Sequence, residues 1–173
     1  MKETVIAKKR RLSPASTGED LAALYLEEKG ACLLERNFRV GKRCEIDIIA
    51  ILEEADGKPH RDAKRTRYLT FVEVKTRRYE TDPGAIEHTG LQAISRDKRQ
   101  KIRLGALSYL EKLRKEPLPA HLGKSESLFL PLRFDLVLVD LQLSREAMQE
   151  FLKENDTTAL KKAARIKHFE AIF

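Results

Sequence analysis

The sequence predicts a mixed β-sheet with helices packed on it, in the α/β class, with α+β as the alternative. Two observations carry this prediction. Runs of alternating or continuous apolar residues, typical of strands, occupy 31–40, 44–52, 68–77 and about 132–141. Segments whose apolar residues recur at helical spacing precede, separate and follow these runs. The chain has 173 residues, which is enough for one domain with a substantial core.

The amino-terminal part divides into a tail and a first helix. Residues 1–15 contain four consecutive basic residues and then a Ser-Pro pair, which predicts a basic flexible tail before a single domain at 16–173. We expect a helix to begin after Thr17, with Thr17 as its cap and Asp20 at the return position of a weak capping box. Gly30 is placed to end this helix.

The first two predicted strands, 31–40 and 44–52, form a hairpin around the turn at 41–43. Polar residues with Gly and Pro predict a long loop over 53–67, before the third strand. A second loop is expected over 78–94, where Pro and Gly recur. The connections between the strands therefore differ greatly in length.

The strongest helix pattern follows Ser95, which is placed to cap it, and Pro117 closes it. One face of this helix is apolar, and its first half carries a basic cluster. The basic residues of that half are Lys98, Arg99, Lys101 and Arg103. After the last apolar strand, a shorter helix at about 144–154 and a mixed final segment complete the prediction.

Composition favours an anionic partner in a reducing compartment. The net charge is +7 and 35% of the residues are charged, which points to nucleic acid first and an anionic membrane second. The two cysteines, Cys32 and Cys44, fit no zinc or redox spacing. No stretch approaches the roughly 20 apolar residues of a membrane span. We therefore expect a soluble cytoplasmic protein that makes no membrane contact.

Acidic residues interrupt the second strand. Glu45 and Asp47 lie two apart within "CEIDIIAIL", so a regular strand would place both carboxylates on one face. Such a face is costly when it is buried and its acids are unpaired. Three arrangements resolve the problem: an exposed edge, pairing with basic side chains, or a bound metal ion.

An acid and a base alternate on the third strand in the same way. Glu73 and Lys75, in "FVEVK", share a face, and if the faces of the two strands match, Asp47 and Glu73 lie side by side. On its own, this pattern is typical of a solvated strand face. Asp47 in the preceding apolar strand and the basic helix downstream favour an active site instead, because a nuclease needs phosphate contacts.

These side chains suit the hydrolysis of a phosphodiester. Mg²⁺ prefers oxygen ligands and is often bound by one or two carboxylates together with phosphate oxygens. Such an ion polarises the phosphoryl group and makes a bound water more acidic. An ammonium group nearby orients that water or stabilises developing charge. Asp47, Glu73 and Lys75 supply these parts.

Several ordered motifs resemble the YraN-like family of small bacterial proteins. They are "GEDLAALYLEEKG", "LERNFRVGKRCEIDIIA", "FVEVKTR", "RFDLVLVD" and "IKHFEAIF", which together cover most of the chain from Gly18 onward. That family is similar to the restriction-endonuclease-like (PD-(D/E)xK) superfamily, which includes Holliday-junction resolvases. The resemblance implies a central mixed sheet flanked by helices, with the site on the second and third strands. Asp47 and Glu73 then correspond to the metal-binding acids and Lys75 to the lysine.

The resemblance implies three further roles. Glu19 corresponds to an acid that approaches the metal site in the resolvase-like branch, and the backbone carbonyl of Val74 to a further metal ligand. Glu45 occupies the acidic position of a G-E-I-D signature, where a supporting role is expected. The chain departs from the family at Cys44, where glycine is usual, and in the length of the loop 53–67.

We therefore expect a Mg²⁺-dependent endonuclease, with Mn²⁺ as a second candidate metal, that hydrolyses DNA phosphodiester bonds, including those of branched or structured DNA. One alternative is a non-catalytic nucleic-acid-binding module that keeps the nuclease fold. Another is an interaction protein whose charge serves a protein partner. Lys98, Arg99 and Lys101 are candidate phosphate contacts, with a solvated helix face as the equal alternative. The sequence does not decide whether two copies combine as a homodimer.

Overall fold

The computed structural model describes residues 16–42, 44–55, 65–79, 94–116, 130–154 and 157–173. The predicted tail, 1–15, lies outside the described residues, as does most of the predicted loop 78–94. The elements are, in order, α1 (Thr17–Glu28), β1 (Cys32–Val40), β2 (Cys44–Ala55), β3 (Arg65–Tyr79), α2 (Arg96–Lys115), β4 (Leu132–Gln142), α3 (Arg145–Glu154), α4 (Thr157–Lys162) and β5 (Ala164–Phe169).

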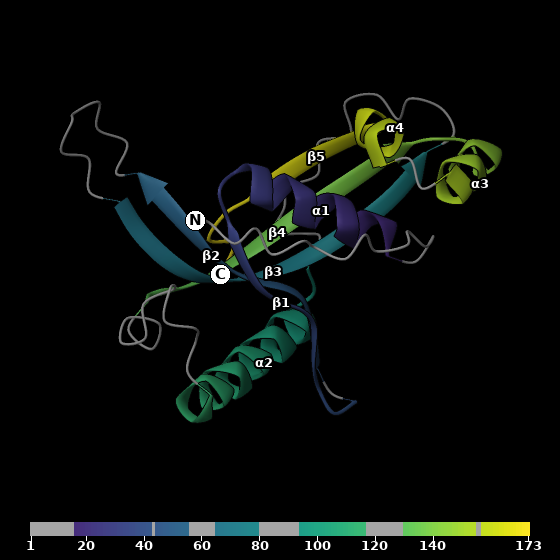
Figure 1. Cartoon of the computed structure of the whole chain (residues 1–173). Helices are drawn as coiled ribbons and strands as arrows, with labels where there is room; N and C mark the ends of the chain where they lie inside the picture. Colours follow the sequence, from purple (N-terminus) through teal and green to yellow (C-terminus); the bar gives the residue numbers. More distant parts are fainter. Residues whose placement is uncertain (1–15, 43, 56–64, 80–93, 117–129, 155–156) are drawn as a thin grey trace.

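The five strands form one sheet in the order β1-β2-β3-β4-β5 (Figure 1). β1 and β2 pair antiparallel, as the predicted hairpin requires, and so do β2 with β3 and β4 with β5. β3 and β4 are parallel, and α2 lies between them in the chain because parallel neighbours need a crossover connection. This mixed sheet with flanking helices belongs to the α+β class and agrees with the restriction-endonuclease-like fold.

Helices cover both faces of the sheet (Figure 1). α1, α3 and α4 lie over one face, and α2 lies across the other. On β3, Phe71 packs into the core towards α2, whereas Val72 and Val74 pack into the core towards α1. Alternate residues of this strand therefore enter opposite cores, as the period of two predicts.

The predicted loop over 53–67 is wrong in its extent. β2 continues to Ala55, and β3 already begins at Arg65. Glu53 pairs across the two strands with Arg67, with 3.7 Å between Oε1 and Nε. Opposite charges at facing positions stabilise a strand pair, so a segment with the composition of a loop forms a ladder here.

The first turn of α1 differs from the prediction by one residue. Ser16 is the N-cap, and Thr17 is the first helical residue and fully buried. Ser16 Oγ donates to the Asp20 carboxylate at 3.1 Å and does not cap a backbone amide, so the predicted capping box is absent from this turn. Asp20 is held instead by Arg36 of β1, with 2.7 Å between Oδ1 and Nη2. This ion pair ties the start of α1 to the sheet.

A buried polar network ties the carboxyl-terminal segment to β4. Asp135 is 1% exposed, and its Oδ2 accepts from Arg133 Nη2 at 2.9 Å and lies 2.9 Å from His168 Nε2. Its Oδ1 accepts the backbone N–H of Ala171 at 3.0 Å. Arg133 and Asp135 thus pair with each other, and Asp135 joins the carboxyl-terminal segment to β4.

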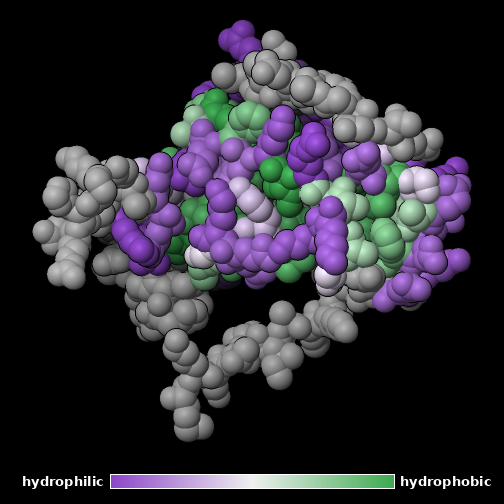
Figure 2. All heavy atoms as spheres, turned by 90° about the horizontal axis from the view of Figure 1, so that it is seen from above, coloured by the Kyte–Doolittle hydropathy of each residue, from purple (hydrophilic) through white to green (hydrophobic). Residues whose placement is uncertain are grey.

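The described surface mixes polar and apolar side chains. Seen from the side of α1, α3 and α4, hydrophilic residues occupy much of the coloured surface, with hydrophobic patches between them (Figure 2). The described part of α2 exposes two large hydrophobic side chains, Leu104 (60%) and Leu107 (62%). None of the helices in the described ranges combines the length and apolarity needed to cross a bilayer.

Gly18 provides a test of how closely α1 packs on β3. A Cβ at this position would lie 1.7 Å from Thr76 Oγ1 and 2.7 Å from Thr76 Cβ. Although alanine is the better helix former, we expect Gly18→Ala to lower the free energy of unfolding by about 1–3 kcal/mol, because it overpacks this contact. Urea unfolding measures the change. Thr76→Ala in the same chain should restore part of the loss; a Gly18→Ala variant as stable as wild type would contradict the close approach.

Candidate functional site

The alternation of side chains along β2 breaks at Asp47. Ile46 packs in the core towards α2, whereas Ile48, two residues later, packs in the core towards α1. In a regular strand, residues at this spacing share a face. The register of β2 with β3 starts at the pair Ile48–Val72 and continues away from Asp47. The break therefore lies at the point where the two strands separate.

Asp47 joins the two strands beyond the end of their ladder. Its Oδ2 accepts the backbone N–H of Val74 on β3 at 2.7 Å. Glu73, the preceding residue on β3, is 3% exposed, and it points towards α2 because Val72 and Val74 on either side of it pack towards α1. The two carboxylates are close enough for the charge of Glu73 to act on Asp47.

Two ammonium groups hold the carboxylate of Glu73. Lys75 Nζ lies 3.1 Å from Oε1, and Lys98 Nζ lies 2.7 Å from Oε2. Lys75 shares the strand face of Glu73, as the alternation predicted. Lys98 comes from the first turn of α2, where its backbone N–H donates to the cap residue Ser95 at 3.2 Å, the cap that the sequence predicted. The capped start of α2 thus fixes Lys98 beside β3.

Burial and the neighbouring charges both shift the pKa values of the cluster. Burial, together with the charges of Glu73 and Glu19, raises the pKa of Asp47 from 3.8 to about 7, against the opposing hydrogen bond from Val74 and the charge of Lys98. Burial alone would lower the pKa of Lys98, but the hydrogen bond and charge of Glu73 raise it above its ordinary value. Asp47 therefore titrates near neutral pH, where added positive charge would favour its ionised form.

α1 brings a third acid to the place where β2 and β3 separate. The close approach of Gly18 to Thr76 places the first turn of α1 against β3. The next residue is Glu19, whose Oε2 lies 4.0 Å from Arg36 Nη2. The charge of Glu19 contributes to the raised pKa of Asp47. Four elements, α1, β2, β3 and α2, therefore converge on one group of charged side chains.

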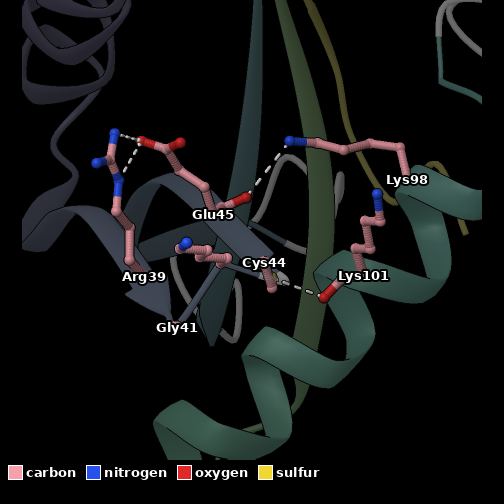
Figure 3. Close-up of a pocket in the computed structure, with 7 residues that line it drawn as sticks. Arg39, Gly41, Cys44, Glu45, Lys98 and Lys101 are labelled. Carbon is pink, nitrogen blue, oxygen red and sulfur yellow. Dashed lines mark hydrogen bonds and ion pairs between the residues drawn. The ribbon is translucent and has the colours of Figure 1, made fainter.

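Glu45 takes a different partner from Asp47. Its Oε1 accepts from both Nε (2.9 Å) and Nη2 (2.7 Å) of Arg39, the residue opposite it on β1 (Figure 3). Lys98 Nζ reaches the backbone carbonyl of Glu45 at 3.4 Å, so Glu45 borders the cluster through its main chain. The supporting role expected for Glu45 could therefore act through the contact of its backbone carbonyl with Lys98.

The three basic residues predicted to contact phosphate lie in three different environments. Lys98 is bound to Glu73 and belongs to the cluster. Lys101 lines a groove next to it (Figure 3). Arg99 donates from Nε to the backbone carbonyl of Ile94 at 3.3 Å, and its guanidinium lies 5.8 Å from the ring centre of Phe173. The basic half of α2 is thus not one uniform surface.

Sequence reasoning missed the ion pairs that the hairpin and α1 supply. Arg39 and Glu45 occupy mirror positions about the turn that contains Gly41, so the hairpin register could have paired them. Arg36 contacts Asp20 across elements that are distant in sequence, and no local pattern indicates that contact. The ion pair between Lys98 and Glu73 is likewise a tertiary contact, although the sequence indicated a functional role for each residue separately.

The acids fit a metal ion only in an open site. Among the described residues, no three His, Cys, Asp or Glu side chains lie close enough together to cage a metal ion. Asp47 and Glu73 supply two carboxylates, which matches the way Mg²⁺ is bound by one or two acids with water and substrate oxygens completing the shell. The N–H and C=O groups of a paired strand residue point to the same side, so the carbonyl of Val74 is also directed towards β2. The donor set fits a hard divalent ion shared with a substrate.

The raised pKa of Asp47 predicts how stability depends on pH. In the unfolded chain Asp47 ionises near 3.8 but in the folded protein only near 7, so its ionisation disfavours the folded state increasingly as pH rises between these values. Asp47→Asn keeps an acceptor for the Val74 amide and removes the charge. In EDTA, we expect the variant to be more stable than wild type by about 1–2 kcal/mol at pH 8. At pH 4 the difference should vanish, and a constant difference across this range by urea unfolding would contradict the assignment.

Comparisons with known proteins match most of this framework. The model of the uncharacterised protein family UPF0102 matches residues 18–139, which contain every member of the charged cluster. A UPF0102 protein of Syntrophus aciditrophicus is 34% identical over 133 residues, covering 77% of this chain and 80% of the relative. One from Rhodococcus opacus is 38% identical over 99 residues (57% and 68%), and one from Streptomyces coelicolor 41% over 86 residues (50% and 52%). The chain therefore belongs to the uncharacterised UPF0102, or YraN-like, family.

Proposed function

We propose that this protein is a divalent-metal-dependent endonuclease that hydrolyses DNA phosphodiester bonds. The observation that carries the proposal is the pair of carboxylates at the separation of β2 and β3, Asp47 and Glu73, with the ammonium of Lys75 3.1 Å from the second. An ordinary solvated strand face would not be 3% exposed at its acid, as Glu73 is. A partly buried acid with a strongly raised pKa, as Asp47 is, is typical of functional sites.

Each side chain has a distinct part in the proposed reaction. Asp47 and Glu73 hold Mg²⁺ or Mn²⁺, and the Val74 carbonyl is a further candidate ligand. The bound ion would supply Lewis-acid polarisation of the phosphoryl oxygen and a more acidic water. Lys75 lies on the same strand face, where its ammonium orients the attacking water or stabilises the charge that develops on the phosphate. Glu19 adds negative charge at longer range.

One observation favours a second candidate, a DNA-binding module without catalysis. Both oxygens of Glu73 are occupied by ammonium groups, from Lys75 and Lys98. A carboxylate neutralised in this way is also what a structural ion-pair network contains. The two candidates differ in whether DNA is cut when a metal ion is present.

Substitutions in the cluster test the proposal directly. With plasmid and four-way-junction DNA in Mg²⁺ or Mn²⁺, we expect Asp47→Asn and Glu73→Gln to lower the cleavage rate about a hundredfold or more, because each removes a metal ligand. Lys75→Met should lower it similarly without weakening metal binding, since it removes no ligand. Glu53→Gln removes an acid of β2, the strand of Asp47, that lies outside the cluster. It is the matched control and should cut DNA at the wild-type rate.

The wild-type reaction must also stop in EDTA. Cleavage that survives in Asp47→Asn or Glu73→Gln would rule out the cluster as its source. Salt-sensitive binding without cutting by the wild type would leave the binding module. Comparison of linear with four-way-junction DNA tests the preference for branched substrates that the resemblance implies.

Lys98 gives a prediction about metal affinity. Its ammonium occupies Oε2 of Glu73 and so competes with a cation for that carboxylate. At pH 8, we expect Lys98→Met to bind Mn²⁺ about tenfold more tightly than wild type, as removal of one nearby positive charge implies. Titration calorimetry measures the affinity. Lys101→Met removes the same charge from the same helix without a contact to Glu73, and it should change the affinity little; weaker binding by Lys98→Met would contradict competition.

A further inference from the structure

A groove adjoins the carboxylate cluster on the side of α2. It has a volume of about 450 Å³ and is formed by the end of β1, the following turn, the start of β2 and the first two turns of α2. In Figure 3, Lys98 extends from α2 towards the main chain of Glu45, and the guanidinium of Arg39 faces the Glu45 carboxylate. The lining residues are Arg39, Gly41, Lys42, Cys44, Glu45, Lys98 and Lys101.

The groove carries more positive charge than its own acid can offset. Four of its residues are cationic and Glu45 alone is acidic. Arg39 is paired with Glu45, and Lys98 with Glu73 outside the groove. Lys42 and Lys101 are exposed, and neither forms an ion pair with any residue in the described part of the chain. Two cations are therefore available to an anionic ligand.

The wall between the two cationic sides is neutral. Burial raises the pKa of the Cys44 thiol, which stays protonated and donates to the backbone carbonyl of Lys101 at 2.8 Å. Gly105 allows this contact, since a Cβ there would lie 2.6 Å from Cys44 Sγ. The hydrogen bond joins the start of β2 to α2, two of the elements that form the groove. A second acid in this wall would offset half of the charge that Lys42 and Lys101 supply.

The groove lies next to the cluster and is joined to it by Lys98. Lys98 Nζ lies 3.4 Å from the backbone oxygen of Glu45 and 2.7 Å from Glu73 Oε2, so one side chain borders both. Along β2, Glu45 precedes Asp47 by two residues, a rise of about 7 Å. A strand of nucleic acid with one phosphate at Asp47 and Glu73 would therefore have its neighbouring nucleotide at the groove.

From these contacts we propose that the groove binds the phosphodiester backbone of the DNA strand, one step from the phosphate that is cut. Lys42 and Lys101 contact the backbone. Glu45 pairs with Arg39 until a phosphate takes the place of the Glu45 carboxylate. This assignment rests on the proposed function, because it names where that substrate lies. None of the described residues that line the groove is aromatic, so the recognition proposed is through backbone charge and not through base stacking.

Binding without turnover tests the groove separately from catalysis. The full chain is titrated against a fluorescent single strand of about 20 nucleotides and mixed sequence, in EDTA. Lys42→Ala with Lys101→Ala should weaken binding about tenfold at low salt and make the slope of log K against log salt shallower by about 1.4, for two lost contacts. The control pair Arg114→Ala with Lys115→Ala removes two exposed charges at the far end of α2 and should have little effect.

Glu45→Gln gives the opposite expected sign. Loss of the carboxylate frees Arg39, and binding should become about threefold tighter, since a cation at the groove gains access to phosphate. Weaker binding by Glu45→Gln would overturn this role of Glu45, and equal losses in the groove and control pairs would overturn the groove itself. Cleavage measured separately in Mg²⁺ distinguishes the two claims. If the groove variants weaken DNA binding but the wild type does not cut, the groove is supported and the nuclease proposal is contradicted. If the wild type cuts DNA but the groove variants bind DNA as well as the control variants, the nuclease proposal is supported and the groove is contradicted.

Discussion

The hydrogen bond from the Val74 amide to Asp47 spans β2 and β3 where their ladder has ended. Without the separation of these strands, Asp47 would face one core or the other, where an acid is costly. In the gap, its carboxylate satisfies a backbone donor and lies beside Glu73. The packing of Ile46 and Ile48 into opposite cores fixes this arrangement, so the hydrophobic cores on both sides of the sheet position the two acids.

The arrangement of the cluster costs stability. Burial and the like charge of Glu73 raise the pKa of Asp47, so holding the two carboxylates together lowers the stability of the folded protein. Lys75 and Lys98 offset this repulsion in the absence of a metal ion. The second of them comes from α2, whose capped start positions it, and whose next turn lines the basic groove. One helix thus serves both the proposed reaction centre and the proposed path of the DNA backbone.

The first four strands, the hairpin and the capped α2 were predictable from the sequence because apolar period, turn residues and a cap are local features, whereas β5 (Ala164–Phe169) lies in the final segment, for which no strand was predicted. Glu73 and Lys75 share a face for the same local reason. The break at Asp47 was not predictable, since period two alone places Glu45 and Asp47 on one face, while the structure engages them from β1 and β3 respectively. The ion pairs of Asp20 with Arg36 and of Glu73 with Lys98 were also not predictable. Their partners come from elements that only the tertiary fold brings together.

The central claim is that Asp47 and Glu73 form one divalent-metal site at the separation of the strands. Anomalous scattering from a crystal of the protein grown with Mn²⁺ tests this most directly, because it locates the ion without reference to activity. We expect a single strong peak within about 2–2.5 Å of a carboxylate oxygen of each residue, with Lys98 displaced from Glu73. A peak elsewhere on the protein, or an unoccupied pair of carboxylates with Lys98 still bound, would contradict it.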